Sequence, residues 1–268
     1  MRVFISADIE GITDVTCWPD TEKGSISYDK AAAQMTAEVA AACRGALKAG
    51  ADEVVVRDAH DSAMNIDHKG LPRGVKLIRG WASGLCSMMT SVEDGFDLCF
   101  MVGYHSPGYS DGNPLAHTMT HTGIMKTLLN GRIMSEMEYN GLYAARHGVP
   151  LGLVTGDKAL CELGKEIFPA LHTVAVKEGN SSATYNMHPD DAVDAIEEEA
   201  FKTVKAAMEG QIKPIEVPEW FELSIQFKEF AKAQDAARYP GAFQIDAHTV
   251  GFETHDADEL FTAYTFMH

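Results

Sequence analysis

The chain has 268 residues, of which 46% are hydrophobic and 23% charged, a composition typical of a globular protein with a sizeable core. Its formal net charge of −17 argues against nucleic acid as a partner, because an acidic surface repels phosphate groups. No apolar run reaches the ~20 residues of a membrane span, and no signal-peptide pattern is present, so we expect no membrane association. The five cysteines are dispersed without a C-x-x-C pair, which favours a reducing compartment and predicts a cytoplasmic protein.

The first hundred residues alternate between apolar strands and one long helix. Residues 2–7 form a β-branched and aromatic run, and residues 29–49 are alanine-rich, with apolar residues at four-residue steps before Gly50. Residues 53–56 read as a second strand. This order of strand, helix and strand predicts a right-handed βαβ unit and a parallel sheet. Further strands are predicted at residues 75–78 and 98–102.

The second half continues this pattern and then changes character. Residues 106–113 are rich in glycine and proline and predict a loop. Residues 125–129 and 132–134 predict a hairpin, because the Asn130-Gly131 pair between them favours a tight turn. Helices are predicted at 135–146, 157–166 and 190–209, with strands at 151–155 and 173–177. After a proline-containing linker, we predict a strand at 223–227, a helix near 228–237, two short strands and a terminal helix from residue 256.

These elements predict an α/β fold with a mostly parallel sheet flanked by helices, and a smaller C-terminal α+β lobe. We place the main domain, which carries the candidate metal site, at residues 1–212 and the lobe at residues 213–268. A single domain is also compatible with the pattern.

Side chains that bind metals follow the first predicted strand. Asp8 and Glu10 come directly after it and precede Gly11. Two residues apart on extended backbone, both carboxylates point to one side, where they repel each other unless a cation or proton lies between them. A pair of surface acids is the ordinary reading of such a spacing, but the position at the end of an apolar strand favours metal.

Two histidines follow later strands. His60 comes after the second strand and His105 after the strand at 98–102. Ligands bind beyond the carboxyl ends of strands in open α/β sheets, so both histidines should share an edge with the two acids. We expect Asp58 or Asp61 to accept the second ring N–H of His60, as carboxylates commonly do for metal-binding histidines. Each histidine alone is as compatible with a hydrogen-bonding role.

Further candidates lie between residues 115 and 138. His117 and His121 would share a face if this segment were a strand, and either is a candidate acid or base, although a solvent-facing or threonine-bonded role is the better expectation for His121. Glu136 and Glu138 open a predicted helix, where acids also complement the helix dipole. Spacing alone does not choose between these two glutamates.

The mixed oxygen and imidazole donors suit zinc, manganese, cobalt or iron. Five protein ligands exceed the ~3 that one catalytic zinc usually takes, so two metals sharing a carboxylate are the economical arrangement. Such pairs generate hydroxide and polarise a carbonyl or phosphoryl oxygen, which predicts a hydrolase of unspecified substrate.

Several segments occur in an order that resembles a known family. They are residues 4–12, Asp58-Ala59-His60, Gly103-Tyr104-His105, Ala116-His117-Thr118-Met119, Asn130-Gly131-Arg132 with Ser135-Glu136, Thr155-Gly156-Asp157 and Ala175-Val176-Lys177. Together they resemble the D-aminopeptidase family of zinc metallopeptidases, of the type encoded in a bacterial dipeptide-transport operon. The resemblance extends over most of the chain, and the motifs are specific only in combination.

The resemblance implies two zinc ions per subunit. It implies ligands at Asp8, Glu10, His60, His105 and Glu136, with Asp8 bridging both ions, and thereby selects Glu136 over Glu138. It also implies His117 as the catalytic residue, which the family treats as a nucleophile and which is equally compatible with a general base or an oxyanion stabiliser.

The resemblance implies a short-peptide substrate with a D-amino-acid N-terminus, and a ring-like homo-oligomer, for which a decamer is one candidate size. Ser135 and Glu138 stand where the family usually has glycine, and His121 is an additional histidine, so these residues are candidates for tuning substrate or metal preference. We expect a dinuclear zinc aminopeptidase that uses a metal-activated hydroxide assisted by His117. The alternatives are another dinuclear amidase or phosphoesterase, and a non-catalytic peptide- or metal-binding protein.

Overall fold

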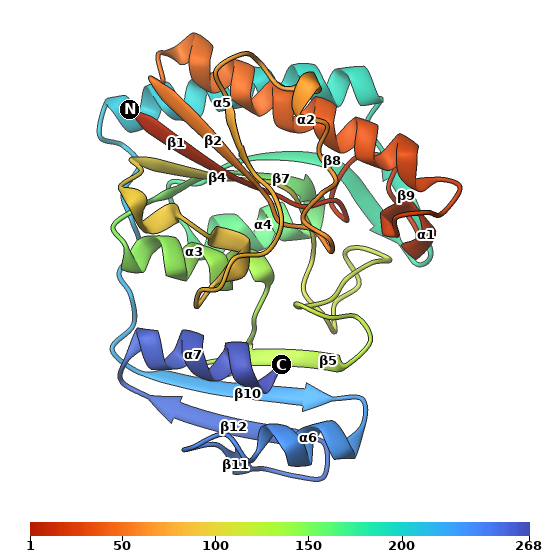
Figure 1. The fold of residues 1–268 in the computed structure, drawn as a ribbon, viewed down its shortest axis with the longest axis vertical. Helices are drawn as coiled ribbons and strands as arrows, with labels where there is room; N and C mark the ends of the chain where they lie inside the picture. Colours follow the sequence, from red (N-terminus) through yellow and green to blue (C-terminus); the bar gives the residue numbers. More distant parts are fainter.

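The computed structural model describes residues 1–268 and contains two β-sheets (Figure 1). The larger sheet has seven strands in the order β3-β2-β1-β4-β7-β8-β9. Their bounds are Arg2–Ala7 (β1), Glu53–Asp58 (β2), Lys76–Ile78 (β3), Leu98–Tyr104 (β4), Leu151–Asp157 (β7), His172–Asn180 (β8) and Ala183–Asn186 (β9). All neighbours are parallel except β8 and β9. The predicted α/β fold with a mostly parallel sheet is therefore confirmed.

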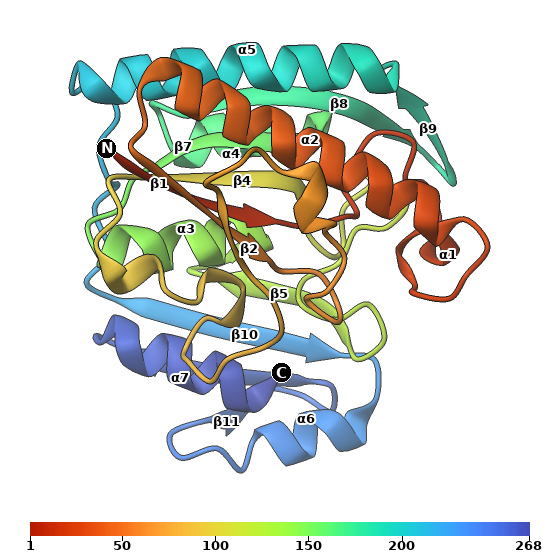
Figure 2. The same ribbon diagram turned by 45° about the horizontal axis from the view of Figure 1, so that its top comes forward.

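Helices cover both faces of this sheet (Figures 1 and 2). On one face, α2 (Tyr28–Ala49) and α5 (Pro189–Met208) pack against each other, and Val3 and Ile5 point into the core beneath them. On the other face lie α3 (Glu136–Arg146) and α4 (Lys158–Ile167), and there Phe4 joins a second core. Successive side chains of β1 thus point alternately into two hydrophobic cores, as expected for a strand buried on both faces.

Two predicted turns have the backbone geometry that their sequences require. Gly50 ends α2 in the left-handed region at φ 108°, which glycine adopts without a Cβ penalty. Asn130 and Gly131 have φ values of 50° and 77° and connect β5 (Ile124–Leu129) to β6 (Arg132–Ile133). Two consecutive positive φ values are what a two-residue hairpin turn needs.

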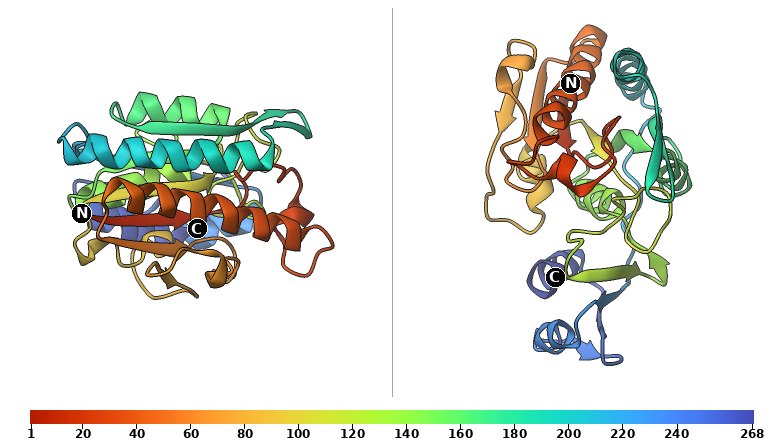
Figure 3. Two further views of the ribbon diagram at one scale, coloured as in Figure 1. Left: turned by 90° about the horizontal axis from the view of Figure 1, so that it is seen from above. Right: turned by 90° about the vertical axis from the view of Figure 1, so that its right-hand side faces the viewer.

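The second sheet is antiparallel and has the order β11-β12-β10-β5-β6. It combines the hairpin with β10 (Phe221–Phe227), β11 (Phe243–Gln244) and β12 (Thr249–Thr254), and α6 (Phe230–Ala236) and α7 (Ala257–Met267) pack on it. Figure 3 shows these C-terminal elements gathered at one end of the molecule. Because β5 pairs with β10, this sheet uses strands from both sides of residue 212. The division into residues 1–212 and 213–268 stays a prediction.

Some elements differ from the sequence-based prediction. The short helix α1 (Trp18–Thr21) and the edge strand β9 were not predicted, because neither has enough residues for a periodic pattern. Residues 115–122 form turns and bends instead of a strand, with Met119 at φ 65°. None of the helices combines the length and the apolar character that crossing a bilayer requires.

Candidate metal centre

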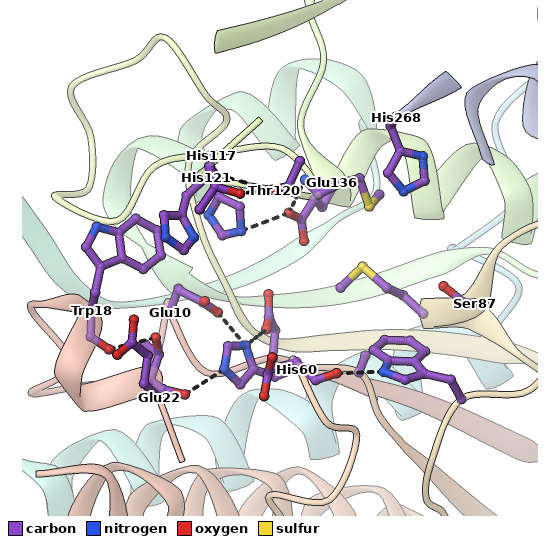
Figure 4. Close-up of a pocket in the computed structure, with 18 of the residues that line it drawn as sticks. Glu10, Trp18, Glu22, His60, Ser87, His117, Thr120, His121, Glu136 and His268 are labelled. Carbon is purple, nitrogen blue, oxygen red and sulfur yellow. Dashed lines mark hydrogen bonds and ion pairs between the residues drawn. The ribbon is translucent and has the colours of Figure 1, made fainter. Parts of the chain in front are cut away.

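The structure brings all six candidate residues to one edge of the parallel sheet. Asp8 and Glu10 follow β1, His60 follows β2 and His105 follows β4. Glu136 is the first residue of α3, and His117 lies in the loop before β5. Five of these side chains are buried and His117 is partly buried. Figure 4 shows Glu10 and His60 on one side of a pocket and His117 and Glu136 on the other.

The six residues form two groups of three, and within each group the possible ligand atoms lie within 4.8 Å of one another. In the first group, Nδ1 of His60 lies 3.3 Å from Oδ1 of Asp8 and 3.1 Å from Oε2 of Glu10. In the second, Nε2 of His105 and Nε2 of His117 each lie 3.6 Å from Oε1 of Glu136.

Asp8 connects the two groups. Its Oδ1 faces His60, and its Oδ2 lies 3.5 Å from Nε2 of His105. A carboxylate with one oxygen turned to each group is the arrangement that a shared ligand of two metals requires.

Each histidine has one ring nitrogen fixed by a backbone carbonyl. His60 Nε2 lies 2.9 Å from Thr21 O, and the Nδ1 atoms of His105 and His117 lie 2.9 Å from Ser106 O and Leu115 O. A carbonyl only accepts, so each of these nitrogens donates and the other nitrogen carries the lone pair in the neutral ring. Those lone pairs point at carboxylates, and Nε2 of His105 has no hydrogen-bond partner. A nitrogen lone pair and a buried carboxylate that face each other can both coordinate a cation placed between them.

The buried acids and histidines of this centre shift one another's pKa values. Burial and the charge of Glu10 raise the pKa of Asp8 to about 8. Burial opposes the charge on His60, but the Glu10 and Asp8 carboxylates hold its pKa well above the usual value. Burial and the neighbouring His105 lower the pKa of His117, so His117 is neutral at neutral pH. The donor set therefore suits divalent metal, with oxygen and imidazole ligands and no thiolate.

Two glycines allow the backbone to approach closely enough to form this centre. A Cβ on Gly11 would lie 1.8 Å from the carbonyl oxygen of Tyr104, and a Cβ on Gly103 would lie 2.3 Å from that of Asp8. Gly103 also has φ 75°. The segment after β1 therefore packs directly on the end of β4, which places Asp8 beside His105.

The pocket beside these residues has a volume of about 550 Å³, in the range of small-molecule sites. Its wall includes an aromatic stack, in which the rings of Trp18 and His121 lie 3.8 Å apart. Trp18 also makes an edge-to-face contact with His117, whose ring stacks on His105 at 4.3 Å. His121 is partly exposed, and its ring stacks on Trp18 because α1 folds across this loop, a contact that the sequence did not predict.

The expectation about the hydrogen-bond partner of His60 needs correction. Neither Asp58 nor Asp61 accepts a hydrogen bond from His60; Thr21 O of α1 accepts it instead, and Asp58 accepts hydrogen bonds from Asn65. Glu138 does not join either group of ligand atoms, because its buried carboxylate pairs with Arg132. Trp18 and Trp81, which also lines the pocket, carried no signal in the sequence.

Comparisons with known proteins cover the whole chain. A family model described as D-aminopeptidase matches residues 1–266. The chain is 28% identical over 270 residues to a D-aminopeptidase of Bacillus subtilis, a match covering 100% of this chain and 96% of the relative. A solved structure of the zinc-dependent D-aminopeptidase DppA from Bacillus subtilis, described as a self-compartmentalizing protease, superposes with a TM-score of 0.91 at 27% identity. That match also covers 100% of this chain and 96% of the other.

Proposed function

The chain belongs to the D-aminopeptidase family of metallo-aminopeptidases, and from this premise we propose that it is a dinuclear zinc enzyme that hydrolyses short peptides. One observation carries the dinuclear site. Three histidines, each held by a backbone carbonyl through one nitrogen, direct the other at three buried carboxylates, and Asp8 faces both groups.

Asp8, Glu10 and His60 would hold one ion, and Asp8, His105 and Glu136 the other. Two divalent cations would offset the three buried carboxylates, whose burial and, to a smaller extent, mutual repulsion raise the pKa of Asp8. Zinc, when bound, supplies an activated water and polarises the scissile carbonyl.

His117 is the proposed proton-transfer residue. Its Nδ1–H is donated to Leu115 O, so Nε2 is the atom that accepts a proton, and it points into the pocket beside Glu136. The lowered pKa of His117 keeps Nε2 unprotonated at neutral pH and ready to act as a base. The proton comes from the attacking water, and the same nitrogen then donates it to the leaving amine as the C–N bond breaks. The edge-to-face contact with Trp18 and the stacking on His105 limit the rotation of the ring.

The substrate we propose is a short peptide with a free N-terminus. The pocket volume of about 550 Å³ matches a small ligand, and the names of the related proteins support an N-terminal D-residue. The related self-compartmentalizing protease supports assembly of this chain into a ring-like homo-oligomer. A decamer would have a mass of about 291 kDa, ten times that of the 29.1 kDa chain, which light scattering would measure. The five free cysteines support a cytoplasmic location.

The test is a peptide panel assayed with zinc-saturated protein. We expect release of the first residue from dipeptides and tripeptides that begin with a D-amino acid. N-acetylated versions should be inert, because an aminopeptidase requires the free amine. Their L-counterparts measure the chiral preference.

Three results would contradict the proposal in different ways. Equal cleavage of acetylated peptides would indicate an amidase or endopeptidase. Hydrolysis of a generic phosphodiester without peptide cleavage would indicate a phosphoesterase. Zinc binding with no hydrolysis of any substrate would indicate a binding protein.

A further inference from the structure

A buried amide lies behind the metal centre and contacts none of its candidate ligand side chains. Asn113 is 4% exposed and lies in the loop between β4 and β5. Its Nδ2 donates to the backbone carbonyl of Glu10 at 3.1 Å and to Oδ2 of Asp157 at 3.2 Å. Its Oδ1 accepts from Leu115 N at 2.9 Å. Each of these three partners leads to a different part of the site.

The first partner fixes Glu10. Its carbonyl accepts from Asn113 and also from Nζ of Lys177, which is buried in β8 and donates in addition to Val15 O at 2.5 Å. Two donors from separate elements therefore converge on one carbonyl oxygen. The backbone of Glu10 cannot rotate without losing both hydrogen bonds.

The second partner fixes His105. Asp157 accepts from Ser106 N at 2.6 Å and from Ser106 Oγ at 2.5 Å, and it also caps α4 through Leu160 N. The carbonyl of Ser106 in turn accepts from Nδ1 of His105. Asp157 thus anchors the His105 segment to α4, and the Asn113 amide connects that anchor to Glu10.

The third partner fixes His117. The N–H of Leu115 donates to Asn113 Oδ1, and the carbonyl of the same residue accepts from Nδ1 of His117. The ring that we propose as the proton-transfer group is therefore two hydrogen bonds away from Asn113.

We propose that Asn113 is a positioning residue that fixes Glu10, His105 and His117 relative to one another, and that Lys177 is the second group that holds the Glu10 backbone. This inference rests on the proposed function. Removing Asn113 would free three backbone segments at once, and groups that orient metal ligands typically contribute 10- to 100-fold to metal affinity.

The experiment compares Asn113→Ala, Lys177→Met and wild type in three measurements. Zinc affinity is measured by competition with a chromophoric chelator. The kcat and KM for a cleaved tripeptide are measured at zinc saturation, and thermal unfolding is measured on the metal-free proteins. The matched control is Asn186→Ala. Asn186 in β9 accepts from Asp14 N at 3.1 Å, and so fixes the loop after β1, which carries Glu10, without contacting the backbone of a candidate ligand.

We expect zinc affinity to fall by about 10- to 100-fold in Asn113→Ala and to fall also in Lys177→Met. Asn113→Ala should lower kcat at zinc saturation while KM changes little, because only this variant also releases His117. Asn186→Ala should retain zinc affinity and kcat. If Asn113→Ala does not fold, the zinc affinity of Lys177→Met tests the inference: a lower affinity supports it and an unchanged affinity refutes it.

Unchanged zinc affinity in the folded variants would overturn the inference. An equal loss of zinc affinity in Asn113→Ala and Asn186→Ala would also overturn it, because that result would reflect a general loosening of the loop after β1. A wild-type protein that binds no zinc would instead refute the proposed function, and this inference with it.

Discussion

A buried glutamate that does not line the pocket predicts how stability changes with pH. Glu38 lies on α2 with 0% exposure. Its Oε1 accepts from Thr13 N and from Nε2 of Gln34, each at 3.1 Å, while its Oε2 has no partner. Burial raises the pKa of Glu38 from 4.5 to about 7. The folded protein therefore holds this proton more tightly than the unfolded chain does.

The direction of the effect follows from proton binding. Between pH 4.5 and 7 the folded state binds more protons at Glu38 than the unfolded state, so the stability contribution of Glu38 falls as pH rises. A change from 4.5 to about 7 corresponds to about 3 kcal/mol. Glu38→Gln keeps the shape and the accepting oxygen but carries no charge. The variant should match wild type below pH 4.5 and exceed it by about 3 kcal/mol at pH 8.

Urea unfolding of both proteins at pH 4, 6 and 8 measures this difference, because the contributions of all other groups cancel. Glu166→Gln, an exposed substitution on α4, controls for exchanging a helical glutamate for an amide. A difference between Glu38→Gln and wild type that stays constant with pH, or that favours wild type at pH 8, would refute the reasoning.

Three further predictions concern the site. Gly11→Ala should lower the free energy of unfolding by at least about 1–3 kcal/mol and reduce the amount of bound zinc, because the new Cβ would overlap Tyr104 O. Unfolding experiments and metal analysis measure both effects. Gly84→Ala is the control, because no atom lies within 4 Å of a Cβ at that position. His117→Ala should lower kcat by about 10²–10⁴-fold with zinc retained, as measured by turnover and metal analysis, whereas loss of zinc would make it a ligand. Trp18→Ala should raise KM by about twofold to tenfold, since a lost aromatic contact is worth about 0.5–1.5 kcal/mol, and an unchanged KM in peptide kinetics would exclude Trp18 from substrate contact.

The strand-end residues could be predicted because a parallel sheet imposes their position. Asp8, Glu10, His60 and His105 each follow an apolar strand, and the carboxyl ends of such strands meet at one edge whatever the loops do. The hairpin was predictable for a similar reason, since Asn130-Gly131 determines its turn locally.

The remaining features depend on contacts that sequence spacing does not encode. Glu136 and Glu138 both lie in the first turn of α3, and only the packed structure turns one to His105 and the other to Arg132. Trp18 belongs to a four-residue helix, too short for any periodic signal. Asn113 lies in a glycine-rich loop, and two of its three partners, Glu10 and Asp157, come from segments distant in the sequence.

The central claim is a dinuclear zinc site bridged by Asp8, and the metal content of purified, zinc-repleted protein tests it most directly. We expect about two zinc ions per chain in wild type and a sharp fall in Asp8→Ala, because that carboxylate faces both groups of ligands. A folded Asp8→Ala variant that keeps both ions would contradict the shared ligand. Wild-type protein without stoichiometric metal would contradict the mechanism as a whole.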